Sequence, residues 1–388
     1  MKRILPYSLI LASALAAYAC SDSSSGSSGS SGDITPDEDS GIVGDLDGGG
    51  GDTGDGAPVI KPGTEDPTGN PILLGGAPRV VRTFTPGGGA PPHFVDGPAW
   101  AKDSLFVALP FATNLTNEKG ILANFKADGT SYLELRGGDK ITTGVVGNSV
   151  DANGLLISAE LASVTRTEAN GTVTVIATTA GDDAGAGVSG FQGPNDLVAL
   201  ADGTIFVTDP GYNVNPRPAS GYLWKLDATA AAVFPVTATA AVTFSNNPSP
   251  NGIALSKDQK FLFVGFTAPA APELPYVRLY AVGAGGTLDD KGKLFELPGD
   301  SQPDGLATDD SNNVYIALKT GIAVYKTTLT GTPSAEPYGG AMAKVPQTAI
   351  PEEPTGMAFG GADRKSLFVT TKNGRVLELK TKTAGLLH

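Results

Sequence analysis

Short apolar runs recur along residues 79–388, and a polar turn precedes each of them. A short motif precedes every such turn. It consists of a residue that we call position X, followed by glycine, an apolar residue and alanine, or a close variant of this order. Position X is occupied in turn by Asp96, Asn148, Asn195, Asn251, Asp304 and Thr355. Successive X residues are 52, 47, 56, 53 and 51 positions apart. A unit that repeats about every 50 residues is typical of a radial or stacked array.

The apolar run after each turn is rich in β-branched and aromatic residues, which predicts a strand. These strands are expected at residues 104–108, 155–159, 204–208, 261–265, 313–317 and 366–370. A further strand is expected after each of them, at residues 121–126, 164–168, 222–226, 277–282, 321–325 and 375–379. Turns such as Asp128-Gly129 and Asn170-Gly171 then lead to an outer strand, for example residues 172–177. Helical periodicity is almost absent.

Six units of about four strands each describe an all-β, six-bladed β-propeller. The last unit ends near the C-terminus without an outer strand, so we expect residues 79–84 to supply that strand and close the ring. In a propeller the innermost strands run along a central channel, and the loops that enter them lie at one mouth. The X side chains are therefore expected around that mouth. A β-sandwich is the competing fold, but it does not explain a polar residue at one register of every unit.

The X residues include a set of oxygen donors that suits a hard cation. Asp96 and Asp304 offer carboxylates, and Asn195 and Asn251 offer amide oxygens. Ca²⁺ or another divalent cation accepts such ligands in loose geometry. Asn148 is expected to line the same channel mouth, and Thr355 is expected to form part of its wall without binding the ion. Asp and Asn before glycine are also ordinary turn residues, but their recurrence at five of six X positions favours a metal site.

The N-terminal residues 1–78 differ from the rest of the chain. Residues 1–19 have the basic start, apolar stretch and small closing residues of a secretory signal peptide. The only cysteine, Cys20, follows at the cleavage point, which predicts a lipidated protein anchored in a bacterial cell envelope, at the outer membrane or the periplasmic face. An ordinary secreted protein is the alternative. Residues 20–78 are of low complexity, rich in Ser, Gly and Asp, and are expected to form a disordered linker.

Charge and histidine content change this picture little. The net charge of −13 lies mostly in the linker, where residues 21–70 carry eleven acidic residues against one lysine. No basic patch supports nucleic-acid binding. The two histidines, His93 and His388, argue against a histidine metal site or a Ser-His-Asp triad. We expect His93 to be a surface turn residue, with a role as acid or base as the alternative.

Several motifs resemble those of the gluconolactonase/regucalcin family over residues 79–388. They are Asp96-Gly97-Pro98-Ala99-Trp100, Gly193-Pro194-Asn195-Asp196-Leu197, Pro250-Asn251-Gly252 and Pro303-Asp304-Gly305. The resemblance implies a six-bladed, calcium-dependent propeller that hydrolyses lactones. It also implies metal binding by the four residues Asp96, Asn195, Asn251 and Asp304. The family's opening Glu is Asp96 here, and Leu161 stands where the lactonase subgroup often has His.

The favoured hypothesis is a monomeric metal-dependent hydrolase that acts on a small-molecule lactone, such as a sugar lactone. The metal ion would polarise the ester carbonyl, and Asp304 would accept a proton from the attacking water. Asn148, Glu160 and Tyr212 are candidates for contacts with substrate hydroxyl groups. The alternative hypothesis is a non-catalytic, lipid-anchored propeller that binds a protein or a glycan.

Overall fold

The computed structural model describes the folded part of the chain. The described residues are 72–73, 78–84, 94–113, 119–136, 144–181, 190–212, 214–228, 233–267, 269, 272–297, 301–337, 344–346, 350 and 352–387. They all belong to one compact unit that spans residues 60–388. The predicted signal peptide, Cys20, most of the predicted linker and His93 lie outside the described residues. Within the described ranges, no helix has the length and apolar character needed to span a bilayer.

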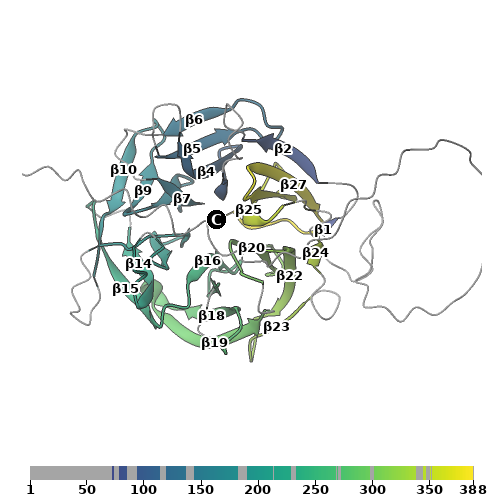
Figure 1. The fold of residues 1–388 in the computed structure, drawn as a ribbon. Coiled ribbons are helices and arrows are strands. Elements are labelled where there is room, and N and C mark those ends of the chain that lie inside the picture. Colours follow the sequence, from purple (N-terminus) through teal and green to yellow (C-terminus); the bar gives the residue numbers. More distant parts are fainter. Residues whose placement is uncertain are drawn as a thin grey trace, which may run out of the picture. The chain divides into compact units, whose positions relative to one another are not determined.

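Six antiparallel sheets, which we number as blades 1 to 6, make up this unit (Figure 1). Blade 1 contains β3 (Asp96–Ala101), β4 (Ser104–Thr113), β5 (Lys119–Phe125) and β6 (Leu133–Arg136). Blade 2 contains β7 (Val145–Val150), β8 (Leu156–Glu160), β9 (Ser163–Thr167) and β10 (Val173–Ala177). Blade 3 contains β12 (Leu197–Ala199), β13 (Thr204–Asp209), β14 (Ser220–Asp227) and β15 (Thr237–Ser245), and β11 (Thr179–Gly181) pairs with β15 in parallel.

Blades 4 to 6 follow the same order from the axis outwards. Blade 4 contains β16 (Pro250–Leu255), β17 (Phe261–Phe266), β18 (Tyr276–Val282) and β19 (Leu288–Glu296), with a short 3₁₀ turn at Ala284–Gly286. Blade 5 contains β20 (Leu306–Thr308), β21 (Val314–Leu318), β22 (Gly321–Thr328), β23 (Ser334–Pro337) and β24 (Lys344–Pro346). Blade 6 contains β25 (Pro354–Gly360), β26 (Ser366–Thr371) and β27 (Arg375–Thr381), with β1 (Ile72–Leu73) and β2 (Arg79–Thr83) at its edge.

The blades form a closed ring, which confirms the predicted six-bladed propeller. Each innermost strand contacts the next one, and β25 of blade 6 contacts β3 of blade 1. The predicted closure by an N-terminal strand is also confirmed, because β2 pairs with β27 at Arg79↔Glu378 and Val80↔Leu377. Strand β1 pairs with β27 as well, at Ile72↔Thr381. The paired part of the chain thus reaches back beyond residue 79.

The X residues differ from the prediction in one respect: most of them lie in the innermost strand itself. Asp96 begins β3, and Asn251 and Thr355 are second in β16 and β25. The register of these strands shifts just after position X, between Asp96 and Ala99 in β3 for example. Such a β-bulge re-aims a side chain, and it explains why turn-forming residues occur inside a strand.

Apolar packing joins the blades to one another. Six clusters of buried apolar side chains occupy the six seams between neighbouring blades. At the seam that closes the ring, Trp100 of blade 1 stacks on Phe368 of blade 6, with ring centroids 5.4 Å apart. Aromatic pairs of this kind contribute about 0.5–1.5 kcal/mol beyond the area that they bury. No blade can bury both of its faces alone, so the ring is the folding unit.

Around the axis, glycine permits the backbones of neighbouring blades to touch. A Cβ atom on Gly252 would lie 2.2 Å from the carbonyl oxygen of Asp304, and one on Gly147 would lie 2.3 Å from that of Asn195. The Gly252 N–H donates to the same Asp304 oxygen at 3.1 Å. Glycine next to position X is thus required by the contact between blades.

The C-terminal segment lies at the centre of the ring (Figure 1). Its backbone bonds place it at the end of β20 away from Asp304. The Leu386 N–H donates to the carbonyl oxygen of Thr308, the last residue of β20, at 2.9 Å. The Gly385 N–H donates to the carbonyl oxygen of Arg364 at 2.8 Å, and the Arg364 guanidinium donates back to Gly385 at 3.1 Å. These bonds hold the last described residues across the axis.

The contact at Gly252 gives a test of this architecture. Replacing Gly252 by Ala forces the Asp304 backbone aside, so we expect the free energy of unfolding to fall by about 1–3 kcal/mol. Denaturant unfolding followed by circular dichroism measures this change. The matched control is Gly190→Ala, because a Cβ atom at Gly190 meets nothing within 4 Å. Equal stability of the two variants would show that the innermost strands are not in close contact.

Candidate functional site

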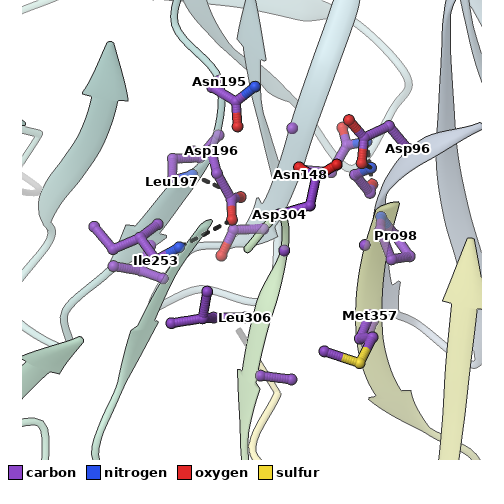
Figure 2. A pocket seen from close by; sticks show the side chains of 18 of the residues that line it. Asp96, Pro98, Asn148, Asn195, Asp196, Leu197, Ile253, Asp304, Leu306 and Met357 are labelled. Carbon is purple, nitrogen blue, oxygen red and sulfur yellow. Dashed lines mark hydrogen bonds between the residues drawn. The ribbon is translucent and has the colours of Figure 1, made fainter. Parts of the chain in front are cut away.

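The innermost strands enclose a small cavity on the axis. Five of the six X residues line it, as the sequence predicted by register: Asp96, Asn148, Asn195, Asn251 and Asp304. Figure 2 shows Asp96, Asn148, Asn195 and Asp304 around this cavity, together with Asp196. Thr355 does not line the cavity; its buried hydroxyl donates to the carbonyl oxygen of Val95 at 2.6 Å.

Asp96 brings a buried carboxylate to the cavity. Its Oδ1 accepts a hydrogen bond from the Gly97 N–H at 2.8 Å, which fixes the side chain. The pKa of Asp96 is raised to about 7, mainly by burial and in part by the Asp196 carboxylate. The Thr355 hydroxyl and the Lys372 ammonium act in the opposite direction on this pKa. At neutral pH the Asp96 carboxylate is thus held in an environment that disfavours its charge.

Asp304 lies on the same axis just before β20, and its environment is similar. Burial raises the pKa of Asp304 well above its usual value, and the Asp96 carboxylate adds to the rise. The Lys372 ammonium and a hydrogen bond from Asn251 only partly offset these effects. The carboxylate of Asp196 raises the pKa of Asp96, that of Asp96 raises the pKa of Asp304, and that of Asp304 raises the pKa of Asp196. A cluster of carboxylates that repel one another in this way attracts a cation.

Asn251 supplies the clearest sign of a missing partner. Its Nδ2 donates to the Tyr212 hydroxyl at 3.5 Å. Asn251 lines the cavity, and its Oδ1 is buried there. This oxygen has no hydrogen-bond partner among the described residues. A buried oxygen without a partner costs about 1–3 kcal/mol. A cation at this position would satisfy it.

Asn148 is fixed at both ends of its amide. The Nδ2 donates to the carbonyl oxygen of Gly97 in blade 1 at 2.7 Å, and Oδ1 accepts from the Ser158 hydroxyl at 2.7 Å. The side chain therefore ties blade 2 to blade 1 at the wall of the cavity. The amide oxygen keeps a second lone pair, since a carbonyl oxygen accepts two hydrogen bonds.

The structure does not bring Glu160 into the cavity. This residue ends β8 with no exposed surface, and its carboxylate accepts hydrogen bonds from Thr165 at 2.7 Å and Ser163 at 3.2 Å. Tyr212 is nearer to the site, because its hydroxyl meets Asn251 and its pKa is raised by burial and by the Asp304 carboxylate.

Asp196 is a site residue to which the sequence analysis assigned no role. It lines the cavity, where its carboxylate accepts from the Leu197 N–H at 2.8 Å and from the Ile253 N–H of blade 4 at 3.2 Å. Burial raises the pKa of Asp196 to about 7, and the Asp304 carboxylate contributes. The sequence does contain a sign of this role, because glycine follows four of the X residues, whereas the acidic Asp196 follows Asn195.

The residues that line the cavity suit a divalent cation held by a mixture of carboxylate and amide oxygens. Among the described residues, no group of three or more His, Cys, Asp or Glu side chains is arranged to hold a metal ion. Two carboxylates and two amide oxygens from the X positions, one of them without a partner, remain as the donor set. Oxygen ligands of this kind suit calcium.

Comparisons with known proteins agree on the fold. A gluconolactonase of Zymomonas mobilis subsp. mobilis is 23% identical over 204 residues, which are 50% of this chain and 52% of that protein. This chain thus spans about half the length of the curated relative. The solved gluconolactonase of Xanthomonas campestris has a TM-score of 0.55 and 22% identity, over 80% of this chain and 97% of that chain. The calcium-binding protein regucalcin of Agrobacterium tumefaciens has a TM-score of 0.55 and 15% identity, over 82% and 97%.

A family-level match covers more of the chain than the sequence match to the curated relative does. The sequence model of the SMP-30/Gluconolactonase/LRE-like region matches residues 125–373, from the end of β5 to the turn after β26. The matched part is more than half of the chain and contains five of the six X residues. The motif resemblance is therefore confirmed: the chain belongs to the SMP-30/gluconolactonase/LRE-like family.

Proposed function

We propose that this protein hydrolyses a lactone, such as a sugar lactone, with the help of a divalent metal ion, calcium in the first place. The observation that carries the proposal is the convergence of Asp96, Asn195, Asn251 and Asp304 on one axial cavity. Gluconolactonases and a calcium-binding regucalcin share the fold, which supports this choice among the many functions that propellers host.

These four residues would hold the ion. Its two positive charges would offset the repulsion between the buried carboxylates of Asp96 and Asp304, and the unpaired Oδ1 of Asn251 would gain a partner. When bound, the ion supplies Lewis acidity that polarises an ester carbonyl and stabilises negative charge on its oxygen. Asp196 carries a further negative charge beside the set, and we propose that it positions Asn195 and strengthens cation binding.

Asp304 is the proposed general base. Its raised pKa suits a carboxylate that accepts a proton from water near neutral pH, since a base works best when its pKa lies near the working pH. The nearby Lys372 ammonium, which is paired with the Glu353 carboxylate, lowers the pKa of Asp304 and so favours its ionised form. The Asp304 carboxylate would then orient the attacking water towards the carbonyl carbon.

Substrate hydroxyl groups would be held by side chains at the wall of the mouth. Tyr212 can serve through its hydroxyl beside Asn251, and Asn148 through the second lone pair of its Oδ1. We propose no substrate contact for Glu160, because Ser163 and Thr165 already bind its carboxylate.

We also propose that the protein works in a bacterial cell envelope, with Cys20 acylated and inserted in a lipid bilayer. The support for this is the sequence pattern of residues 1–20. A flexible linker after Cys20 would place the propeller at a distance from the membrane.

Replacement of Asp304 by Ala tests the function. The variant loses a ligand and the general base, so the calcium-dependent rate of lactone opening should fall at least about 100-fold. Ring opening is followed on a panel of sugar and aliphatic lactones, and bound metal by elemental analysis. The matched control is Asp289→Ala, which removes an exposed carboxylate on β19. This variant should keep both the lactone-opening activity and the bound metal. Failure of the unaltered protein to open any lactone of the panel would favour a binding protein instead.

Replacement of Asp96 by Asn tests the electrostatic cost of the site. Asparagine keeps the acceptor for the Gly97 N–H and removes one of the repelling charges. In a chelator at about pH 8, where the wild-type carboxylate is ionised, the variant should therefore melt about 2–4 °C higher for each kcal/mol of repulsion removed. Thermal unfolding by calorimetry measures the difference, while isothermal titration should show weaker calcium binding.

The pH dependence of this difference has a definite sign. A folded-state pKa of about 7 for Asp96, above its ordinary 3.8, means that the folded protein holds a proton that the unfolded chain releases. The stability from this proton is complete below the unfolded pKa and is lost as pH rises through about 7. The advantage of the variant should therefore shrink at about pH 5. A variant less stable than wild type at both pH values would contradict the repulsion.

A further inference from the structure

A second hollow lies away from the axis, at the seam between blades 3 and 4. It measures about 990 Å³, counting its open mouth. Strand β15 of blade 3 forms one side and strands β18 and β19 of blade 4 form the other. Its lining includes buried Phe244, Tyr276 and Tyr280 and exposed Ser245 and Asn246. None of these residues belongs to the axial cavity.

The alternation of strand β18 places three polar-tipped side chains on the face that borders this hollow. Tyr276, Arg278 and Tyr280 are two residues apart, and side chains at that spacing share one face of a strand. All three line the hollow. Phe244 of β15 packs in the same core cluster as Tyr276 and Tyr280, so aromatic side chains from both blades meet at the base of the hollow.

The Tyr280 hydroxyl is the feature of the hollow that packing does not explain. Tyr280 is 1% exposed, and its hydroxyl is buried without a hydrogen-bond partner among the described residues. Such a group lowers stability because it gives up its hydrogen bonds to water and gains none in return, whereas a phenylalanine would fill the same space without that loss. A buried polar group of this kind is explained when a ligand pairs with it.

The charged groups around the hollow are neutralised by one another. The Arg278 guanidinium donates to the Asp290 carboxylate through Nε at 2.8 Å and through Nη2 at 2.5 Å. The Lys293 ammonium lies 4.7 Å from the Tyr276 ring centroid and 3.6 Å from the Glu273 carboxylate. An ion would have to break these pairs to enter, so the hollow favours an uncharged ligand.

We infer that the hollow binds an uncharged carbohydrate of one or two sugar rings. Exposed Pro272 above the aromatic base suits the apolar face of a sugar ring, and the Tyr280 hydroxyl supplies a buried donor for a sugar oxygen. Ser245 and Asn246 at the rim add polar groups for the outer hydroxyls. An apolar floor with a few convergent polar groups is the usual composition of a small-ligand site. This site is independent of lactone hydrolysis at the axis.

The inference is tested by saturation-transfer NMR and isothermal titration with maltose, cellobiose and lactose as probes. We expect at least one disaccharide to bind, and Tyr280→Phe to weaken that binding about fivefold, as the loss of one buried hydrogen bond requires. Tyr325→Phe removes the same atom from another buried tyrosine, in blade 5, and should bind as the wild type does. Asp304→Ala should also keep disaccharide binding, which separates this site from the axial one.

Two further measurements keep the test independent of folding. Tyr280→Phe should melt at or above the wild-type temperature, because the hydroxyl that it removes has no partner. Ser245→Trp changes an exposed residue at the rim and should abolish binding by filling the hollow. The inference is overturned if no disaccharide binds, or if Asp304→Ala removes binding that Tyr280→Phe and Ser245→Trp leave intact.

Discussion

Close contact between neighbouring innermost strands is the constraint on which both the ring and its cavity depend. Where Gly252 touches the backbone of Asp304, no side chain fits between the blades, and a hydrogen bond of 3.1 Å joins them. The same contact fixes the distance of each X residue from the axis. The carboxylates of Asp96 and Asp304 are therefore near each other because the blades are, and the closure of the fold itself concentrates negative charge at the mouth.

In blade 3 an acidic residue, and not glycine, follows position X. Where Asn251 and Asp304 are followed by glycine, Asn195 is followed by Asp196, whose carboxylate spans the seam and accepts the Ile253 N–H. The seam is thus held by a buried charge instead of by backbone contact. A neutral acceptor would serve the seam equally well, so the position of this charge beside Asn195 supports the proposed cation site.

The sequence alone predicted the fold well because each blade repeats both its apolar strands and its polar register. The convergence of five X residues followed from that register, and the structure places all five on one cavity. Other features depend on contacts between blades, which a single unit does not reveal. Asp196 resembles a turn residue until its partner Ile253 is known, and Glu160 resembles a free acid until Ser163 and Thr165 are seen to bind it.

The C-terminal segment gives the axial cavity a direction. Leu386 lines the cavity at the end away from position X, held by its bond to Thr308, so a substrate of the proposed reaction would reach the carboxylates from the opposite end. Under the proposed reaction a neutral lactone enters and a carboxylate product forms beside Asp96 and Asp304. Like charges repel strongly where water is excluded. The two charges of the proposed cation would offset Asp96 and Asp304, which leaves the Asp196 carboxylate beside them to disfavour retention of the anionic product.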